Sequence, residues 1–577
     1  QIIDTVVVDI SSLWDPITGR VNLAIPIEMN TRTTDALQMS ATGLYPITIG
    51  LQQGKTVVSQ LVTFVERLGA KLTTPNTQDG LRVALIGSLD GGVTRQNDSS
   101  TLISNNDRAS VAQTIASLED LSTTPITLAI RPEFIEGLDR STLEDGDLLV
   151  RLQSTQSLNI LSNTYVDVDQ ALSDQSESIF TDQLRLGEDT LRLLLPTYKA
   201  TRDIWFQQTP LLSGGAQILR NLGIRNIVML REGSQGAKGA DTDRPPTGLV
   251  ELQLPDGGVI DAAFVDIKLS AALTRGSQNP RGGAYLVAQQ ILAELKMLRS
   301  ELTTNDFSTS DHGVILSTDF GALPSTAMLT ALRATLNANS AITFVSLGDL
   351  LSTMTHEVKD GSRLTLDLTQ DADVPSISHQ LFTQTQERVD AYASMLTPGD
   401  AQAAQWKDLL SVMSARTLSS AQRQSYVDAI WLQTFLLGEA ISTPTSTTFT
   451  LGGRESSLRI SLRNDNDYDV RVRVRLTSSK LTFSAAEQVV LLPSGMTTSI
   501  EVPVVAKSNG SFPVSLQLFS PSGNVAVGRS ITLTARVNAL AGLGQLVTGL
   551  ALLLLIIWWV FHLRRASRRK LNLTSGA

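Results

Sequence analysis

The stretch Leu81-Arg-Val-Ala-Leu-Ile-Gly87 decides the fold of the largest part of this chain. It is an almost continuous apolar run, which is typical of a parallel strand that is buried on both faces. Helical periodicity follows at residues 109–118, and a second apolar run follows at Ile126-Thr-Leu-Ala-Ile130. Strands that alternate with helices predict a parallel sheet with right-handed crossover connections.

The alternation continues along the chain to residue 360. Further buried strands are predicted at residues 158–161, 202–206, 226–230, 314–316 and 342–346. About seven such strand–helix units fit a (β/α) barrel, which we place at residues 78–360. A hairpin insertion is predicted at residues 232–280, with its turn at Pro255-Asp-Gly-Gly258.

Segments of other structural types surround the barrel. Residues 1–70 show period-2 runs punctuated by Gly and Pro, which predict a small β-sandwich that looks incomplete for an immunoglobulin-like domain. Residues 378–438 read as helices. Residues 445–537 alternate apolar and polar side chains between short turns and predict an immunoglobulin-like β-sandwich. The predicted fold class is therefore a multidomain α/β plus β protein.

An apolar segment near the end of the chain predicts a single transmembrane helix at residues 540–563, because about 20 apolar residues span the hydrocarbon core. Tryptophans at its end fit an interfacial aromatic belt, and a basic tail at residues 564–577 follows. A basic flank stays in the cytoplasm, so the bulk of the chain is expected outside it, at the cell membrane. The residues assigned to this membrane interface are Trp558, Trp559, Arg564, Arg565, Arg568, Arg569 and Lys570.

One side of the membrane helix carries small and hydroxyl residues at spacings of three and four. These residues are Gly542, Gln545, Thr548 and Gly549. Small side chains permit close helix packing, so this side is a candidate contact for a partner helix. The alternative is that Gln545 simply lies near the outer interface of the membrane.

The composition excludes several classes of function. The net charge is −9, which argues against nucleic acid as a partner. The chain has no cysteine, which excludes disulfides and thiolate metal sites. No start methionine or signal peptide opens the chain at Gln1, so we expect that an export signal has been removed.

The candidate catalytic residues are carboxylates that follow predicted barrel strands. Asp90 follows the first strand, Glu133 the second, Asp167 and Asp169 the third, and Asp319 a late one. Barrel enzymes carry catalytic groups at such positions, and a glycoside hydrolase needs two carboxylates that face one sugar bond. The alternative is that these carboxylates only solvate or cap loops.

A metal-dependent reaction is not expected. The four histidines are His312, His356, His379 and His562, and none pairs with another at a spacing of four. Metal hydrolases need clustered His and Asp ligands, so we predict no metal and no cofactor. Trp205 is a candidate sugar-stacking residue, although it ends an apolar strand and also fits a core position.

Several stretches together resemble one family of proteins. They are Gly43-Leu-Tyr-Pro46 and residues 81–90, 126–134, 222–228, 345–350 and 464–476. Their order resembles an uncharacterised family of actinobacterial envelope proteins. The resemblance implies an immunoglobulin-like domain, a degenerate deacetylase-like or hydrolase-like barrel, a second immunoglobulin-like domain and a C-terminal membrane helix. It also implies a gene beside that of the lipid II flippase, and it carries over no catalytic residue.

The first functional hypothesis is a non-enzymatic scaffold, anchored in the membrane and lying outside the cytoplasm. The resemblance implies a role in peptidoglycan synthesis, with the lipid II flippase, an integral membrane protein, as the partner and a cell-wall glycan as a second ligand. The alternative is a glycan-active hydrolase that uses Asp90 with Glu133 or Asp167. A third, weaker hypothesis is a glycan-binding module.

Overall fold

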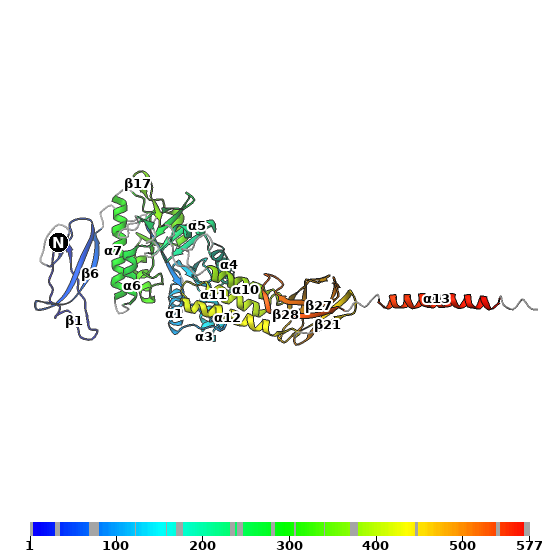
Figure 1. Cartoon of the computed structure of the whole chain (residues 1–577). Helices are drawn as coiled ribbons and strands as arrows, with labels where there is room; N and C mark the ends of the chain where they lie inside the picture. Colours follow the sequence, from blue (N-terminus) through cyan, green and yellow to red (C-terminus); the bar gives the residue numbers. More distant parts are fainter. Residues whose placement is uncertain are drawn as a thin grey trace, which may run out of the picture. The chain divides into compact units, whose positions relative to one another are not determined.

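The computed structural model divides the chain into two units (Figure 1). The first contains residues 1–96, 100–379 and 414–419, and the second contains residues 97–99, 380–413 and 420–577. The structure describes residues 4–28, 35–67, 80–121, 123–156, 158–168, 177–230, 237–238, 246–278, 283–304, 307–339, 341–369, 379–444, 448–537 and 543–570.

Among the described residues, seven parallel strands of the first unit form a closed ring. Neighbouring strands pair in parallel within two groups, β15-β7-β8-β9 and β10-β11-β14. Parallel bridges from Leu161 to Thr201 and from Val265 to Ile315 join the two groups at both ends. The strands are β7 (Leu81–Leu89), β8 (Ile126–Ile130), β9 (Leu158–Leu161), β10 (Ile204–Gln207), β11 (Asn226–Met229), β14 (Val259–Phe264) and β15 (Gly313–Leu316). The predicted barrel is therefore present.

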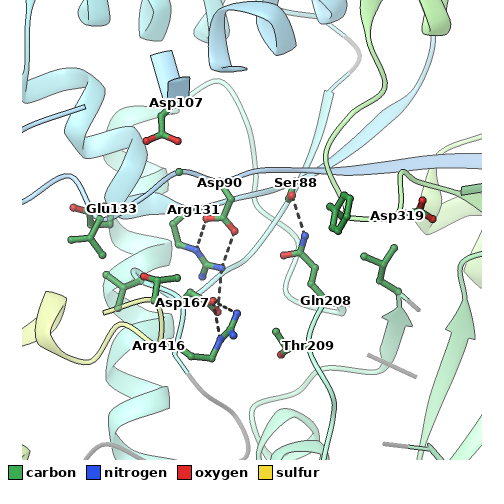
Figure 2. A pocket seen from close by; sticks show the side chains of 16 residues that line it. Ser88, Asp90, Asp107, Arg131, Glu133, Asp167, Gln208, Thr209, Asp319 and Arg416 are labelled. Carbon is green, nitrogen blue, oxygen red and sulfur yellow. Dashed lines mark hydrogen bonds and ion pairs between the residues drawn. The ribbon is translucent and has the colours of Figure 1, made fainter. Parts of the chain in front are cut away.

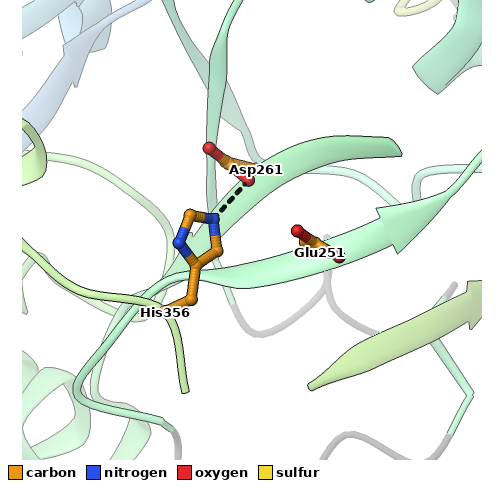
Figure 3. A group of neighbouring side chains, drawn as sticks. All are labelled: Glu251, Asp261 and His356. Atoms are coloured by element: carbon orange, nitrogen blue, oxygen red, sulfur yellow. Dashed lines mark hydrogen bonds and ion pairs between the residues drawn. The ribbon is translucent and has the colours of Figure 1, made fainter. Parts of the chain in front are cut away.

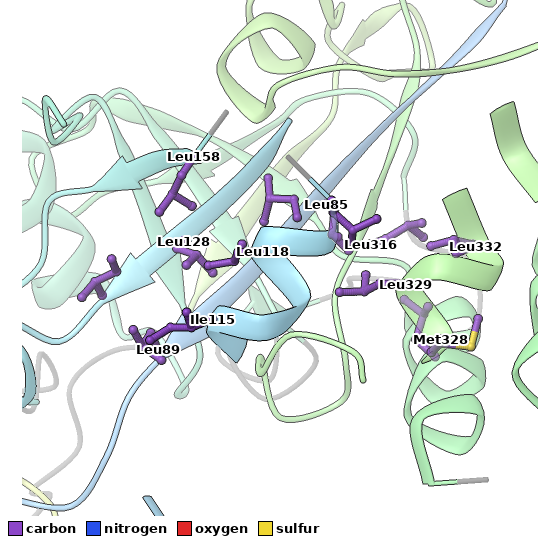
Figure 4. Packing of buried hydrophobic residues seen from close by; sticks show 14 of the residues in the cluster. Leu85, Leu89, Ile115, Leu118, Leu128, Leu158, Leu316, Met328, Leu329 and Leu332 are labelled. Atoms are coloured by element: carbon purple, nitrogen blue, oxygen red, sulfur yellow. The ribbon is translucent and has the colours of Figure 1, made fainter. Parts of the chain in front are cut away.

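Helices cover the outside of the ring and pack their apolar side chains against it (Figure 4). Leu85 and Leu89 of β7 contact this outer layer, whereas Ala84 and Ile86 belong to a second cluster with Phe206. Both faces of β7 are thus buried, which explains its unbroken apolar run. The helices of this outer layer are α1 (Asn105–Asp120), α2 (Pro132–Arg140), α3 (Leu143–Gln153), α4 (Glu177–Leu194), α6 (Ile267–Gln278), α7 (Gly283–Thr304) and α8 (Thr326–Asn337). A further helix, α5 (Ser213–Asn221), follows β10, and α9 (Leu347–Thr353) contributes its apolar side chains to the second cluster instead.

The predicted hairpin is present, but its second strand belongs to the barrel. β13 (Val250–Gln253) pairs antiparallel with β14, and β14 also pairs in parallel with β11. Residues 259–264 are therefore the sixth strand of the ring rather than part of an insertion. The strand predicted last, β16 (Ile342–Phe344), pairs with the beginning of β7. β13 pairs in addition with β19 (Thr365–Leu368), which pairs with β12 (Ala237–Lys238).

The first 67 residues contain one long antiparallel hairpin, β5 (Gly43–Gln53) and β6 (Thr56–Arg67). Two short ladders precede it, β1 (Trp14–Asp15) with β2 (Arg20–Val21) and β3 (Ile27–Glu28) with β4 (Leu37–Gln38). Glu66 of the hairpin forms an ion pair with Lys296 of α7. The sandwich predicted for residues 1–70 stays a prediction.

The second unit begins with three helices, α10 (His379–Ala393), α11 (Ala401–Met413) and α12 (Ser420–Glu439), close to the predicted positions. Two sheets follow, in the orders β20-β22-β26-β24 and β21-β28-β27-β23-β25. Buried apolar residues alternate with exposed ones along β22 and with half-buried arginines along β23, in the predicted alternation of apolar and polar side chains. That this domain is immunoglobulin-like stays a prediction. The strands are β20 (Ile441–Ser442), β21 (Thr448–Leu451), β22 (Glu455–Asn464), β23 (Val470–Thr477), β24 (Leu481–Phe483), β25 (Glu487–Leu492), β26 (Thr497–Ala506), β27 (Gly510–Phe519) and β28 (Ala526–Val537).

The chain continues into α13 (Leu543–Lys570). Its segment Val547–Arg565 is the one helical segment of the described residues that is long and apolar enough to cross a membrane. A single C-terminal membrane helix is thus consistent with the structure, while its orientation stays a prediction.

The residues predicted to contact a partner helix or the membrane interface fall on or beside α13. Gly542 lies outside the described residues, whereas Gln545, Thr548 and Gly549 lie on the first turns of the helix. Trp558 and Trp559 are exposed, and Arg564 and Arg565 follow them. The last turns contain Arg568, Arg569 and Lys570. Partner contacts of this helix stay a prediction.

Candidate active site

A cavity of about 450 Å³ lies in the barrel unit, next to the carboxyl ends of strands β7, β8, β9, β10 and β15. This is the end at which parallel barrels carry their functional groups. Figure 2 shows charged side chains from several loops that converge there. The lining residues are Ser88, Asp90, Gly91, Val93, Asp107, Arg131, Glu133, Val166, Asp167, Gln208, Thr209, Leu230, Asp319, Phe320, Arg416 and Thr417.

Arg131, which directly follows β8, is the central charged group of the cavity. Its side chain is 8% exposed, and it binds Asp90 through Nε at 3.0 Å and through Nη2 at 3.2 Å. Its Nη1 donates to Asn163 and Thr164. Burial lowers the pKa of the Arg131 guanidinium, but Asp90 and Asp167 more than offset this effect and raise the pKa above its usual value. Arg131 is therefore a fixed, permanent positive charge.

Asp167 faces the same guanidinium from the third strand region. Its Oδ1 lies 3.6 Å from Arg131 Nη2, and its Oδ2 lies 2.7 Å from Arg416 Nη2. The backbone N–H of Arg416 also donates to the carbonyl oxygen of Asp167, at 2.6 Å. Asp167 is thus held by two arginines, one buried and one exposed.

Asp90 and Asp167 lie close together because both carboxylates approach the same nitrogen atom, Nη2 of Arg131. Arg131 Nη2 lies 3.2 Å from Asp90 Oδ2 and 3.6 Å from Asp167 Oδ1, so the two oxygens are separated by no more than the sum of these distances. Retaining and inverting glycosidases hold their carboxyl groups roughly 5 to 9.5 Å apart. Both side chains are about one-third exposed, at 32% and 28%, and can therefore meet a substrate.

Glu133 lines the same cavity, but its carboxylate is used by the neighbouring loop. Its oxygens accept from the Thr94 hydroxyl at 2.7 Å and from the Thr94 and Arg95 backbone N–H groups at 3.0 and 2.9 Å. Burial raises the pKa of Glu133, and these hydrogen bonds only partly counter that effect. Glu133 therefore holds the loop after β7 in place, and the pairing of Asp90 with Glu133 is not supported.

A tight turn after β15 brings two further side chains to the cavity wall. The Gly321 N–H donates to the Thr318 carbonyl oxygen at 3.0 Å, and Gly321 has a φ of +78° that favours glycine. Ser88 of β7 donates its N–H to Gly321 at 2.6 Å and so anchors the turn. Phe320 is 76% exposed, and Asp319 Oδ1 is buried without a hydrogen-bond partner among the described residues. The turn therefore presents the apolar ring of Phe320, whereas the unsatisfied oxygen of Asp319 is buried.

Four of the five carboxylates predicted from the sequence, Asp90, Glu133, Asp167 and Asp319, line this cavity, and the structure brings Asp90 and Asp167 together. Asp169 lies outside the described residues. Trp205 is 5% exposed and packs against Phe180, so it is a core residue. The sequence analysis missed Arg131, although its position directly after an apolar strand was a usable signal. It also missed Arg416, which lies 249 residues from its partner Asp167.

Comparison with known proteins gives limited information on identity. A family of unknown function (DUF6049) matches residues 315–569. No curated protein matches the chain. The actinobacterial source and the flippase gene that the resemblance implies stay predictions.

Some solved structures match the backbone of this chain over most of its length, at low sequence identity. A 4-α-glucanotransferase from Thermococcus litoralis matches with 12% identity and a TM-score of 0.40, over 76% of this chain and 87% of that one. An α-mannosidase from Enterococcus faecalis V583 matches with 11% identity and a TM-score of 0.40, over 80% of this chain and 57% of that one. A maltose-forming amylase from Pyrococcus sp. ST04 matches with 10% identity and a TM-score of 0.36, over 61% of this chain and 72% of that one.

These neighbours correct one prediction. The barrel was expected not to be an enzyme, and all three solved structures are named as glycan-active enzymes. The expectation rested on the resemblance to a family with a degenerate barrel, from which no catalytic residue is carried over. The residues that meet at the cavity come from distant loops, and a search for local motifs does not detect such an arrangement.

Proposed function

We propose that the barrel domain is a glycan-active enzyme that cleaves or transfers a glycosidic bond, with Asp90 and Asp167 as its reacting carboxylates. The observation that carries the proposal is the position of both side chains on one nitrogen of Arg131, at the open end of the barrel. Inverting glycosidases hold their two carboxyl groups farther apart than retaining glycosidases do. Because Asp90 and Asp167 lie close together, we assign the retaining reaction. In that reaction one carboxylate forms a covalent bond to the sugar, which water or a second sugar then breaks.

The other residues of the cavity fit the binding of a sugar. The ring of Phe320 offers an exposed apolar face on which a pyranose can stack, and Gln208 supplies an amide that already binds Ser88 at 3.1 Å. Arg131 holds the two carboxylates in fixed positions, so little reorganisation is needed when charge develops on the sugar.

The test is glycan turnover by the full-length protein in detergent. The substrates are an α-glucan, a mannan and purified peptidoglycan, and the readout is the release of new reducing ends. Asp90→Asn and Asp167→Asn should each lower the rate by at least about 100-fold, because each removes a group that acts in the transition state. Asp182→Asn is a matched control, since Asp182 is exposed on α4 and lies outside the cavity.

Two results would overturn the proposal. One is that the wild-type protein turns over none of the three substrates and binds none of them more tightly than the Asp90→Asn/Asp167→Asn double variant. The other is turnover that survives in the double variant.

The site of action is part of the same proposal. The apolar segment Val547–Arg565 of α13, none of which is buried, supports a membrane-anchored protein whose glycan substrate lies in the cell envelope. We also propose that this helix binds an integral membrane partner such as the lipid II flippase. The proposal is based on the side of the helix that the sequence predicts to contact a partner helix. The test replaces residues 543–570 by an unrelated apolar helix and compares co-purified membrane proteins. Unchanged association with a partner would refute the role of the helix.

A further inference from the structure

A second group of ionisable side chains lies in the barrel unit, outside the cavity described above. Glu251 of β13, Asp261 of β14 and His356 each offer a ligand atom, and these atoms lie within 4.8 Å of one another (Figure 3). His356 Nε2 lies 2.9 Å from Asp261 Oδ1. The three side chains are 14%, 33% and 21% exposed, so the group is sheltered but reachable from solvent.

The backbone holds all three residues in place. Glu251 and Asp261 are directly opposite each other in the antiparallel register of β13 and β14. His356 forms a parallel bridge with Leu249, whose N–H donates to Thr355 and whose carbonyl oxygen accepts from Glu357, both at 2.8 Å. The arrangement therefore does not depend on flexible loops.

The arrangement needs positive charge. Like charges directly opposite on neighbouring strands destabilise a sheet, and here two carboxylates occupy such a pair. Arg363 approaches Glu251 Oε1 at 2.9 Å, but its side chain is 61% exposed, and exposed ion pairs contribute little. The two carboxylates together carry a charge that a divalent cation balances.

The spacing of the donor atoms also fits a metal ion. Zinc binds imidazole nitrogen and carboxylate oxygen at about 2.0 to 2.2 Å in a tetrahedral arrangement, so neighbouring ligand atoms on one ion lie roughly 3.4 Å apart. His356 Nε2 and Asp261 Oδ1 are 2.9 Å apart, and all three ligand atoms lie within 4.8 Å of one another, so a small side-chain movement accommodates an ion. Imidazole as a ligand favours zinc, copper, iron or nickel over calcium and magnesium, which prefer oxygen ligands alone.

We propose that Glu251, Asp261 and His356 form a binding site for a divalent transition-metal ion of the zinc class. The ion ties the β13–β14 hairpin to the segment that follows α9, and water completes its coordination. Arg363 and the ion compete for the carboxylate of Glu251. When no ion is bound, the guanidinium of Arg363 partly neutralises that carboxylate. None of the three ligands lines the cavity that contains Asp90. The sequence did not reveal the site, because its ligands lie 10 and 95 positions apart and form no spacing motif.

The test uses full-length protein in detergent after treatment with a chelator. Zn²⁺, Mn²⁺ and Ca²⁺ are titrated separately by calorimetry, and thermal unfolding is followed in parallel. Zn²⁺ should bind with one ion per chain and raise the unfolding temperature, because binding to the folded state stabilises it. His356→Ala should weaken Zn²⁺ binding by more than about 100-fold, since loss of even an outer partner of a metal ligand costs roughly 10- to 100-fold.

Arg363→Ala gives the sharpest result, because it should tighten Zn²⁺ binding by releasing Glu251. A purely structural role for Arg363 predicts the opposite or no change. Arg363 is exposed, so this variant should fold even if His356→Ala does not. Arg220→Ala is the matched control, since it breaks the exposed ion pair with Asp256 and should leave Zn²⁺ binding unchanged. The proposal is overturned if the wild type shows no one-to-one Zn²⁺ binding, or if a folded His356→Ala variant binds Zn²⁺ as tightly as the wild type.

Discussion

Two groups of carboxylates in the barrel unit differ in the charge that neutralises them. Asp90 and Asp167 share Arg131, whose side chain is 8% exposed and is also held by Asn163 and Thr164. Glu251 and Asp261 instead face a partly exposed imidazole and the exposed guanidinium of Arg363. A buried guanidinium is a permanent part of the fold, whereas an exposed one can be displaced. The first group is therefore built to keep its charges in position, and the second is suited to exchange one cation for another.

The largest effect that tests this comparison is expected from Arg131→Met. The change leaves Asp90 and Asp167 facing each other without their buried counterion, and breaking a buried pair in this way costs about 3 to 5 kcal/mol. Urea unfolding of the full-length protein measures it. Arg416→Met is the control, because Arg416 is 42% exposed and its loss should cost about 1 kcal/mol or less. Equal costs for the two variants would contradict the distinction between buried and exposed counterions.

A third carboxylate sharpens the comparison through its pH dependence. Asp145 has a fully buried side chain and binds Arg108 Nε at 2.6 Å and Nη2 at 2.9 Å, and Arg108 holds the pKa of Asp145 below its usual value of 3.8. Because the folded-state pKa is lowered, this pair contributes stability above pH 3.8 that is lost as the pH falls further. Asp145→Asn should lower stability at pH 7 by about 2 to 3 kcal/mol and flatten its loss between pH 4 and 2. Urea midpoints across this range provide the measurement, and an unchanged acid slope would be the contrary result.

A smaller effect separates a structural carboxylate from a reacting one. Glu133→Gln removes an acceptor from the Thr94–Arg95 loop and should destabilise the protein by about 1 to 3 kcal/mol. Glu133 is not one of the proposed reacting carboxylates. Glycan turnover by the Glu133→Gln variant should therefore persist at temperatures where the variant is folded. Asp167→Asn should show the reverse pattern: the free energy of unfolding should change little, and the rate of glycan turnover should fall strongly. Turnover that disappears in Glu133→Gln while the protein stays folded would reassign Glu133 to the reaction.

The smallest effect on stability is expected from Phe320→Ala. The ring is 76% exposed, so its removal should change the free energy of unfolding by no more than about 0.5 kcal/mol. If a sugar stacks on the ring, KM should rise while kcat changes little. Leu193→Ala is a matched control, because Leu193 is 77% exposed and does not line the cavity. A KM that stays the same in Phe320→Ala would remove the stacking role.

The sequence predicted the barrel because a strand buried on both faces produces an apolar run, as β7 does with Ala84 and Leu85 on opposite faces. It assigned β14 to an insertion because Val259, Asp261 and the preceding turn resemble an ordinary hairpin. Asp90 and Asp167 were predictable from their place after strands. Arg416 was not, since its position beside Asp167 depends on how distant parts of the chain meet.

The segment 414–419 belongs to the barrel unit although it lies between α11 and α12 of the other unit. The order of residues along the gene therefore does not match the division of the folded protein. A shortened protein that stops at residue 379 would keep all seven barrel strands and yet lack Arg416, one of the two arginines on Asp167. Exchange of residues 380–577 between relatives would likewise replace part of the cavity wall along with the apolar helix α13.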